Sequence, residues 1–498
     1  MKKHIITTIS LLVFIIFLNS CSEDFLKENP EDRYVVGNFY SNQSDAEAAV
    51  SAVYQQLYGI YERLMFLLNE LPADDEKNGL GMPNQYLQNL EFCRHNSENQ
   101  FARQMWQRCY QGISKANTAI DNIPGVTMDE GIKSRLVAEA KFLRALYYFN
   151  LVRFYGDVPL VLKIEGVDDA LIARTPKEEV YAQIIQDLTD AEAILRPTYS
   201  ANNSGRATQG AAKILLGKVY LTTHDYQKSV DKLAEVVNHE STYGYGLHEY
   251  FGDNWEKETE NGVEMVFSVE FMDPPGNGNN AMQLQGPKYS LPNGFGPLGL
   301  SNSNEADIPT MELYNLFTDE DERKAETFRT EFISLKDGSV HVSSIPIFVK
   351  YWEENESVAV NSDANMHVIR YADALLMYAE ALNEVDQTDE ALIHLNRIRD
   401  RAFNTTDNNY SGLSKEEFRT AVWKERRMEL TQEGHRWFDL ARTGRYIERM
   451  KEHAAYEASV AEPNKTDIIS NISERHVLMP IPQREIDLNP LLKQNEGY

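Results

Sequence analysis

Apolar residues recur at intervals of three and four positions along most of this chain, which is the spacing of amphipathic helices. Clear runs begin near residues 44, 101, 175 and 414. Three of them open with a hydroxyl residue followed by glutamate three positions later, the capping-box pattern that satisfies free backbone N–H groups at a helix start. The pairs are Ser44 with Glu47, Thr175 with Glu178, and Ser414 with Glu417. We therefore predict a mainly α-helical protein.

One stretch is predicted to lie at the centre of the fold. Residues 136–154 become apolar on nearly every side of the helix after Phe142. A helix that is apolar all round is surrounded by other elements. Gly156 is placed to end it in a left-handed conformation, and Pro159 prevents its continuation.

Two segments are typical of helix–turn–helix pairs. One runs over residues 211–236 with a turn at 223–225, and the other over residues 369–398 with a turn near 386–388. Small residues at the expected crossings would let the helices approach closely; they are Ala212, Ala234, Ala379 and Ala391. This is the pattern of tetratricopeptide repeats. Because the pairs are far apart in sequence, we expect scattered repeats within one body and not a tandem array.

The region from residue 243 to residue 368 differs from the rest of the chain in composition and in its hydrophobic pattern. Residues 263–271 and 339–349 alternate like short strands, and the residues between them are rich in Gly, Pro, Asn and aromatic side chains. Such loops lie at the surface, where binding residues concentrate. We expect the ligand-binding part of the protein here.

Two segments combine flat aromatic rings with amides and carboxylates, as sugar binding requires. The first runs from Asp74 to Arg94, and the second from Asn277 to Phe295, with Trp352 further along. The alternative is that each ring only packs its own loop against the body. The candidate ligand contacts are Asp74, Tyr86, Phe92, Tyr289, Phe295 and Trp352.

The N-terminus has the organisation of an export signal. Lys2 and Lys3 precede an apolar run over residues 5–18, which is short for a membrane span, and Cys21 follows. This resembles a bacterial lipoprotein signal, in which residues 1–20 are removed and the thiol of Cys21 carries the lipid. An ordinary secretory signal followed by a chance cysteine is the alternative.

Charge and motifs exclude several functions. The formal charge is −27, and removing Lys2 and Lys3 changes it to −29, which disfavours binding to nucleic acid. Cys and His show no metal-ligand spacing, so we predict neither a metal nor a cofactor. Residues 294–299 match GxGxxG, but without the strand–turn–helix context of a nucleotide site. Cys93 and Cys109 either form a disulfide or are buried free thiols.

Charged residues at helix spacing dominate residues 425–442: Arg426, Arg427, Glu429, Glu433, Arg436 and Asp439. We predict that they form ion pairs that hold helices together. The alternative, a catalytic carboxylate cluster, is disfavoured because ion-pair networks are the commoner cause of such clustering.

Several long blocks resemble the SusD/RagB family of nutrient-binding lipoproteins of the Bacteroidetes outer membrane. Examples are Phe142-Leu-Arg-Ala-Leu-Tyr-Tyr-Phe149 and Arg436-Trp-Phe-Asp-Leu-Ala-Arg442. The resemblance covers the whole mature chain, and its blocks are residues 39–48, 138–161, 370–383, 395–401, 425–442, 479–490 and 494–498.

The resemblance implies one α-rich body of about four tetratricopeptide-like helix pairs, plus a loop-rich ligand-binding half with a few short strands. It divides the chain into a signal peptide (1–20), an N-terminal helical half (21–240), a variable ligand-binding region (241–368) and a C-terminal helical part (369–498).

The resemblance also implies a function. We expect a non-enzymatic, surface-exposed, lipid-anchored protein of the outer membrane that captures glycan for a SusC-like TonB-dependent barrel transporter. A peptide-binding protein on the same scaffold is the main alternative, and an all-helical glycosidase is a weaker one.

Overall fold

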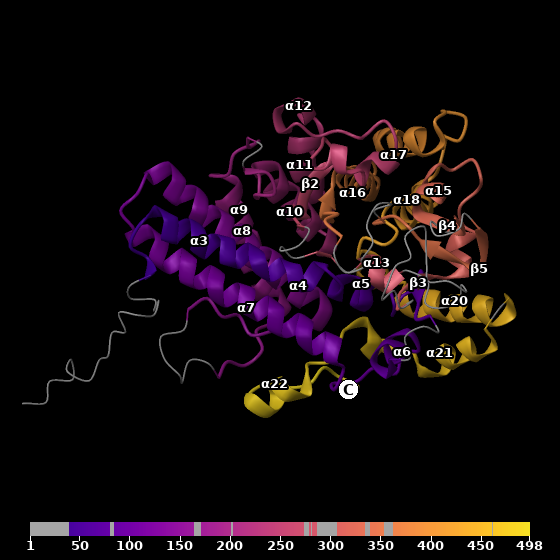
Figure 1. Ribbon diagram of the computed structural model, residues 1–498, viewed down its shortest axis with the longest axis horizontal. Coiled ribbons are helices and arrows are strands. Elements are labelled where there is room, and N and C mark those ends of the chain that lie inside the picture. The colour runs from indigo at the N-terminus through magenta and orange to yellow at the C-terminus, as the bar shows by residue number, and fades with distance from the viewer. Residues whose placement is uncertain are drawn as a thin grey trace, which may run out of the picture.

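Helices form most of the part of the chain that the computed structural model describes, as the sequence predicts (Figure 1). The predicted signal peptide, Cys21, Tyr289, Phe295 and the GxGxxG segment lie outside the described residues. The described residues are 39–79, 84–163, 171–200, 203–272, 278–279, 281–285, 306–333, 339–352, 362–460 and 462–498.

The main body is a stack of helices, each packed on the next in chain order. The helices α10 and α11 are the first predicted pair, and α16 and α17 are the second. These two pairs are neighbours in the fold because α11 packs on α16, although a long insertion separates them in sequence. The stack consists of α7 (Gln100–Asn122), α8 (Glu130–Tyr155), α9 (Lys177–Glu192), α10 (Gln209–Thr222), α11 (Tyr226–Val237), α16 (Tyr371–Glu384) and α17 (Thr388–Phe403).

The other helices of the described residues lie outside this stack. N-terminal elements pack against α7, and α18 packs against α16. These helices are α3 (Gln43–Tyr54), α4 (Tyr58–Tyr61), α5 (Leu64–Asn69), α6 (Gln85–Glu91), α12 (Glu240–Tyr243), α13 (Ala281–Gln285), α14 (Met311–Tyr314), α15 (Arg323–Thr327), α18 (Lys415–Glu429), α19 (Arg436–Arg442), α20 (Tyr446–Val460), α21 (Thr466–Asn471) and α22 (Gln483–Leu488).

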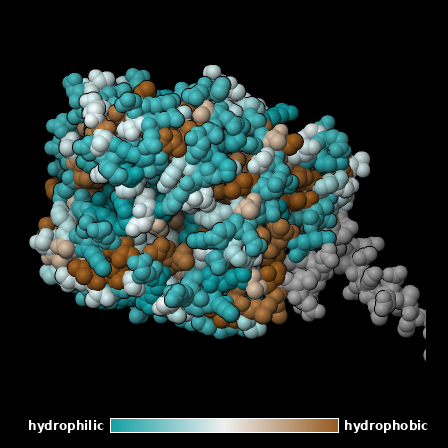
Figure 2. All heavy atoms as spheres, turned by 180° about the vertical axis from the view of Figure 1, so that it is seen from behind, coloured by the Kyte–Doolittle hydropathy of each residue, from teal (hydrophilic) through white to brown (hydrophobic). Residues whose placement is uncertain are grey.

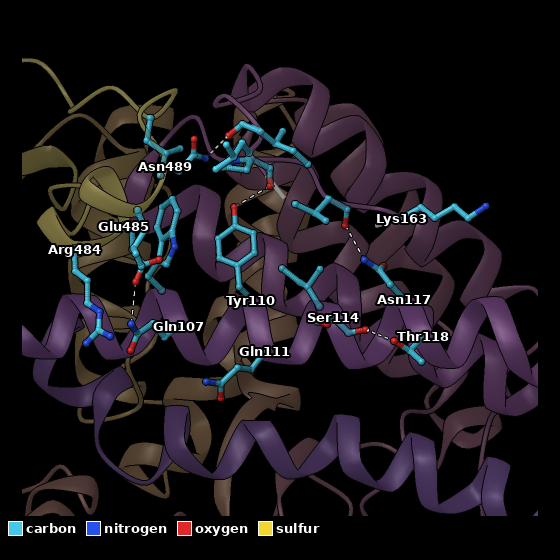
Figure 3. A pocket seen from close by; sticks show the side chains of 18 of the residues that line it. Gln107, Tyr110, Gln111, Ser114, Asn117, Thr118, Lys163, Arg484, Glu485 and Asn489 are labelled. Carbon is cyan, nitrogen blue, oxygen red and sulfur yellow. Dashed lines mark hydrogen bonds between the residues drawn. The ribbon is translucent and has the colours of Figure 1, made fainter. Parts of the chain in front are cut away.

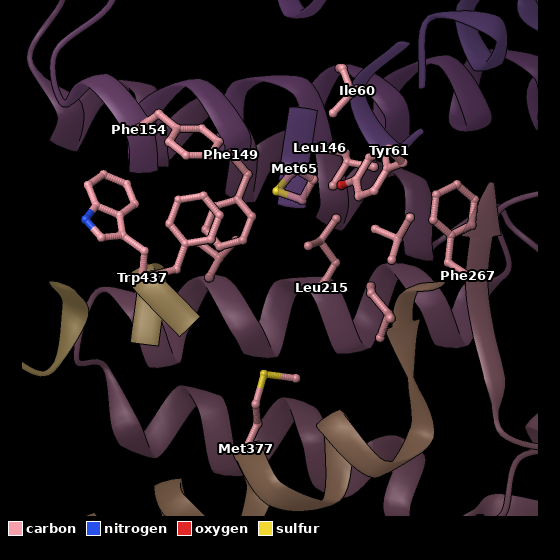
Figure 4. Packing of buried hydrophobic residues seen from close by; sticks show 14 of the residues in the cluster. Ile60, Tyr61, Met65, Leu146, Phe149, Phe154, Leu215, Phe267, Met377 and Trp437 are labelled. Carbon is pink, nitrogen blue, oxygen red and sulfur yellow. The ribbon is translucent and has the colours of Figure 1, made fainter. Parts of the chain in front are cut away.

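The prediction that α8 is central is confirmed, because nearly every side chain from Leu136 to Tyr155 is buried. Gly156 ends the helix with φ +72°, which glycine adopts without strain. Figure 4 shows Phe149 and Leu146 in the core that α8 shares with Leu215 of α10 and Met377 of α16.

Only one of the three predicted capping boxes is confirmed. Ser414 and Glu417 cap α18 reciprocally. The prediction at Ser44 was wrong by two residues, because Asn42 caps α3 together with Asp45. Thr175 does not cap α9 either, since its backbone forms a β-bridge with Val158 and the helix begins after Pro176.

The strands form small sheets that connect the middle of the chain to the helical body. The antiparallel pairs are β1 (Glu76–Lys77) with β3 (Ile308–Pro309), β2 (Met265–Val269) with β6 (Met366–Arg370), and β4 (Phe328–Ile333) with β5 (Val340–Phe348). The two predicted strands, at 263–271 and 339–349, are therefore confirmed. Ile369 was predicted to be helical but lies in β6, where it pairs with Phe267.

Cys93 and Cys109 are both buried free thiols, so they form no disulfide. Within the described ranges, no helix is long and apolar enough to cross a membrane. The face opposite to that of Figure 1 is mainly hydrophilic, and its hydrophobic residues lie in several separate patches (Figure 2).

Candidate functional site

A buried ionic core joins the C-terminal helices to the middle of the chain. Arg370, at the end of β6, donates from Nη2 to Glu433 Oε1 at 2.7 Å and from Nη1 to Glu429 Oε1 at 3.0 Å, and it also contacts Glu264. Burial opposes ionisation of Glu429, but Arg401, Arg370 and other cations outweigh it and lower its pKa to about 2. The prediction that these residues form structural ion pairs is confirmed.

The candidate Asp74 belongs to a second buried ionic cluster, which also involves the C-terminal helices. Its carboxylate is completely buried and accepts hydrogen bonds from Arg436 Nε at 2.6 Å and Arg449 Nε at 2.6 Å, while Arg427 lies 3.1 Å away. Burial opposes its ionisation, yet these three cations hold the pKa of Asp74 well below its ordinary value. Asp74 therefore joins α18, α19 and α20 to the loop before β1 and has no surface to offer a ligand.

The two predicted ligand-binding segments are brought together. The Asn78 side chain, just after β1, donates to the carbonyl oxygen of Ala306 at 3.1 Å. Asn279 and Ser362 form an antiparallel bridge. The backbone N–H of Asp307 donates to the Leu284 carbonyl oxygen at 3.1 Å, and this contact links the two segments, which are far apart in the sequence. We call the region around these contacts and α6 the loop surface.

Tyr86 is the exposed aromatic residue of the loop surface. Asn84 caps α6 by accepting from the backbone N–H of Tyr86 at 2.9 Å, and Asn99 donates to the Tyr86 carbonyl oxygen at 3.1 Å. The Tyr86 side chain is 39% exposed although its backbone is held at both ends. An exposed ring on a backbone held in this way can pack against the apolar face of a sugar.

Phe92 and Trp352 are less exposed. The Phe92 ring is half-buried, with the Arg94 guanidinium 5.3 Å and the Lys465 ammonium 5.2 Å from its centroid. Trp352 is also half-buried, and it packs near Ile308 and Ile347 beside β3. Both rings therefore support the loop surface and leave only part of themselves to contact a ligand.

A pair of carboxyl groups lies buried beneath the loop surface. Glu76 on β1 and Asp307 before β3 are almost completely buried, and neither carboxylate receives a hydrogen bond from a donor within the described part of the chain. Burial raises the pKa of Asp307 to about 6, and burial together with Asp307 raises that of Glu76. The sequence carries no signal for this pair, because its members come from distant segments.

A second surface, which the sequence analysis missed, is a groove of about 960 Å³ between α7 and α22. Figure 3 shows the α7 side chains Gln107, Tyr110, Gln111 and Ser114 along it, with Glu485 of α22 on the other side. Gln107 donates to Glu485 at 2.9 Å, which links the two walls. Amides and hydroxyls in this arrangement can bind sugar hydroxyls. In the sequence these residues resemble only the solvated face of a helix.

Stacked helix pairs with an inserted loop region define the class of this protein as an α-helical repeat fold that presents a composite surface. In the described residues, no group of three His, Cys, Asp or Glu side chains is arranged to hold a metal ion.

Comparison with known proteins identifies the family. A family model described as the SusD family matches residues 342–498, and one described as starch-binding, associating with outer membrane, matches residues 24–221. SusD-like protein P2 of Formosa agariphila is 29% identical, and the alignment covers 100% of both chains.

Two solved structures have the same fold. A laminarin binding SusD-like protein has a TM-score of 0.78 at 29% identity, covering 92% of this chain and 100% of its own. A SusD homolog from Bacteroides thetaiotaomicron has a TM-score of 0.81 at 25% identity, and the match covers 94% of this chain and 100% of the homolog. The chain belongs to the SusD/RagB family, as its sequence blocks indicate.

Proposed function

We propose that this protein binds oligosaccharides or polysaccharides at the outer membrane. The observation that carries the proposal is its full-length similarity to SusD-like proteins, among them one that binds laminarin. The description of the matching N-terminal family model, which names starch binding and outer-membrane association, also supports it.

The loop surface is the proposed glycan site. Tyr86 supplies an exposed ring for the apolar face of a sugar, and the partly exposed Phe92 and Trp352 extend it. Tyr289 and Phe295, which lie outside the described residues, belong to the segment whose ends meet there and remain part of the proposal. Asp74 is left out because its carboxylate is buried and paired with arginines.

The proposed role includes an anchor and a partner. Lipid attached to Cys21 would hold the protein at the cell surface, since two or more acyl chains anchor a protein stably. A SusC-like TonB-dependent barrel would receive the captured glycan. The protein itself would bind without cleaving the ligand.

The first experiment is a combined glycan and peptide array with protein lacking residues 1–21. Binding to glycans without turnover supports the proposal. Binding to peptides alone would establish the peptide-binding alternative, and cleavage of the bound glycan would show an enzyme.

Calorimetry with the best ligand then locates the site. Tyr86→Ala should weaken binding about tenfold, as loss of one aromatic contact of 0.5–1.5 kcal/mol or more implies, and should leave thermal stability unchanged. Ile393→Ala is the control, because Ile393 is 61% exposed on α17, away from α6 (Figure 1). Gln111→Ala tests the groove between α7 and α22. Loss of affinity in Gln111→Ala but not in Tyr86→Ala would move the site to that groove.

A further inference from the structure

A separate cavity of about 590 Å³ lies among α8, α9, α10 and the α18–α19 segment. Arg153 of α8, Tyr181 of α9, Lys218 of α10 and Phe438 of α19 are among its lining residues. Its volume is within the range of small-molecule sites, roughly 300–1,000 Å³. None of the residues of the loop surface lines it.

Arg153 is the unusual side chain of this cavity. Its guanidinium is stacked between two rings, 3.9 Å from the centroid of Phe149 and 3.8 Å from that of Phe438. Nε donates to the Phe149 carbonyl oxygen at 3.1 Å, and Nη2 donates to Asn150 Oδ1 at 2.6 Å. Among the described residues, Nη1 has no hydrogen-bond acceptor and no carboxylate forms a salt bridge with Arg153.

The other buried and partly buried charges near the cavity balance one another. They form a continuous chain in which each cation contacts one or two carboxylates, with three members of each sign. The chain runs Lys218, Asp373, Arg426, Asp439, Arg442 and Glu380.

The remaining titratable groups do not compensate Arg153. His435 is neutral at pH 7, because burial and the adjacent Lys218 lower its pKa to about 3. Lys177 and Glu178 stand exposed at the cavity mouth with opposite charges. Burial lowers the pKa of Arg153 to about 10, so it still carries its charge. Asp439 and Asp373 attract Arg153 through space, but both carboxylates already pair with Lys218, Arg426 or Arg442, so among the described residues Arg153 is left without a carboxylate of its own.

We infer that this cavity binds a small molecule with a carboxylate group, which pairs with the guanidinium of Arg153. A planar guanidinium and a carboxylate form strong, directional hydrogen bonds, and the two rings hold the guanidinium in place. A partly buried charge without a carboxylate of its own is less favourable than a paired one, and an incoming carboxylate reduces that cost. The net charge of −27 repels polyanions, so the ligand is a small monoanion.

The test is an isothermal titration of the protein lacking residues 1–21 with sodium glucuronate, at constant ionic strength, with glucose as the neutral control. Wild type should bind glucuronate and not glucose. Arg153→Gln should lose roughly tenfold or more in affinity, as expected for hydrogen bonds to a charged group. Arg153→Lys should retain weaker binding, because it keeps the charge without the planar fork.

Arg445→Gln is the matched control. The Arg445 guanidinium also stacks on a ring, 3.7 Å from the Trp423 centroid, but Arg445 does not line the cavity. Arg445→Gln should leave the affinity for glucuronate unchanged. Tyr86→Ala should also leave it unchanged, and this result would distinguish the cavity from the proposed glycan site on the loop surface. Equal loss in Arg445→Gln and Arg153→Gln would overturn the inference, as would absence of glucuronate binding to wild type.

Because Arg153→Gln removes packing as well as charge, a second measurement uses the unaltered protein. With nitrogen-15 in the arginine side chains, glucuronate should shift the NMR signals of the Arg153 guanidinium and leave those of Arg445 unchanged. Binding of glucuronate without a shift at Arg153 would place the carboxylate elsewhere and refute the assignment.

Discussion

Individual charged residues such as Arg370 are buried in this protein together with several carboxylates. Glu264 and Glu429 contact its Nη1 and Glu433 contacts its Nη2, and none of these side chains is exposed to solvent. Removing one partner from such a group leaves an uncompensated buried charge, which costs far more than an exposed ion pair contributes. The stability of the C-terminal half therefore depends on a few specific residues.

Glu429→Gln should lower the free energy of unfolding by about 3–5 kcal/mol at pH 7, because Arg370 and Arg401 lose a buried partner. Urea unfolding measures the change. Glu416→Gln is the control, since Glu416 pairs with Arg419 at the surface and should contribute less than about 1 kcal/mol.

The pH dependence of this contribution has a definite sign. The pKa of Glu429 is lowered in the folded state to about 2. Its contribution to stability is thus fully present above its ordinary pKa and is lost as the pH falls toward 2. The difference between wild type and Glu429→Gln should therefore narrow between about pH 4.5 and pH 2. A difference that stays constant over this range would contradict the assignment.

Asp307→Asn should have the opposite effect and stabilise the protein at pH 7. The pKa of Asp307 is raised to about 6, mainly by burial, so the folded state loses stability as the pH rises through that value. This rise of the pKa from its ordinary value to about 6 corresponds to at most ~3 kcal/mol. Unfolding curves of wild type and variant should converge below about pH 4. An Asn variant that is less stable at pH 7 would show that the carboxylate has a partner there.

At the scale of elements, close approach of helices within each pair determines the geometry of the stack. Gly217 lies where α10 crosses α11, and Ser229 of α11 donates to its carbonyl oxygen at 2.9 Å. A Cβ atom on Gly217 would lie 2.6 Å from Leu233 Cγ. The small side chain at 217 is therefore a condition of this crossing.

Gly217→Ala should destabilise the protein in thermal unfolding, even though alanine favours a helix by about 1 kcal/mol. The expected overpacking penalty is about 1–3 kcal/mol, because Leu233 is completely buried and has little room to move. Gly125→Ala is the matched control, as no atom lies within 4 Å of a Cβ atom there. Equal melting temperatures for wild type and Gly217→Ala would mean that the two helices separate at little cost.

Element types were predictable from the sequence, but several boundaries were not. The periodic pattern located α8 and both helix pairs correctly. It could not distinguish Asn42 from Ser44 as the cap of α3, because both residue types cap helices equally well. Thr175 matched the capping pattern but is held by Val158, a tertiary contact that local sequence does not encode.

At the scale of the whole molecule, the predicted lipid anchor at Cys21 sets where the protein works. Cys21→Ala should release the protein from the membrane fraction into the soluble fraction, because the anchor is the only membrane attachment proposed here. Fractionation of cells and immunoblotting measure this. If the Cys21→Ala protein stays in the membrane fraction, the lipid anchor is contradicted. As a control, the variant should have the same melting temperature as the wild type.

The periodic pattern and the charged blocks by themselves determined the helical class, the two helix pairs, the ionic role of residues 425–442 and the family. Each of these properties depends on residues that are close together in the sequence. Other properties depend on which distant segments meet. The sequence predicts Asp74 as a ligand contact, but in the structure three arginines from later helices surround its carboxylate.

Contacts between remote parts of the chain also produce three other features of the structure. These are the Glu76–Asp307 pair, the groove between α7 and α22, and the unpaired charge of Arg153. Hydrophobic periodicity tells which side of a helix faces inward, but it carries no information on the partner that the side chain meets there. Burial and the arrangement of neighbouring charges, which only folding brings about, settle whether a charged side chain supports the body or faces a cavity.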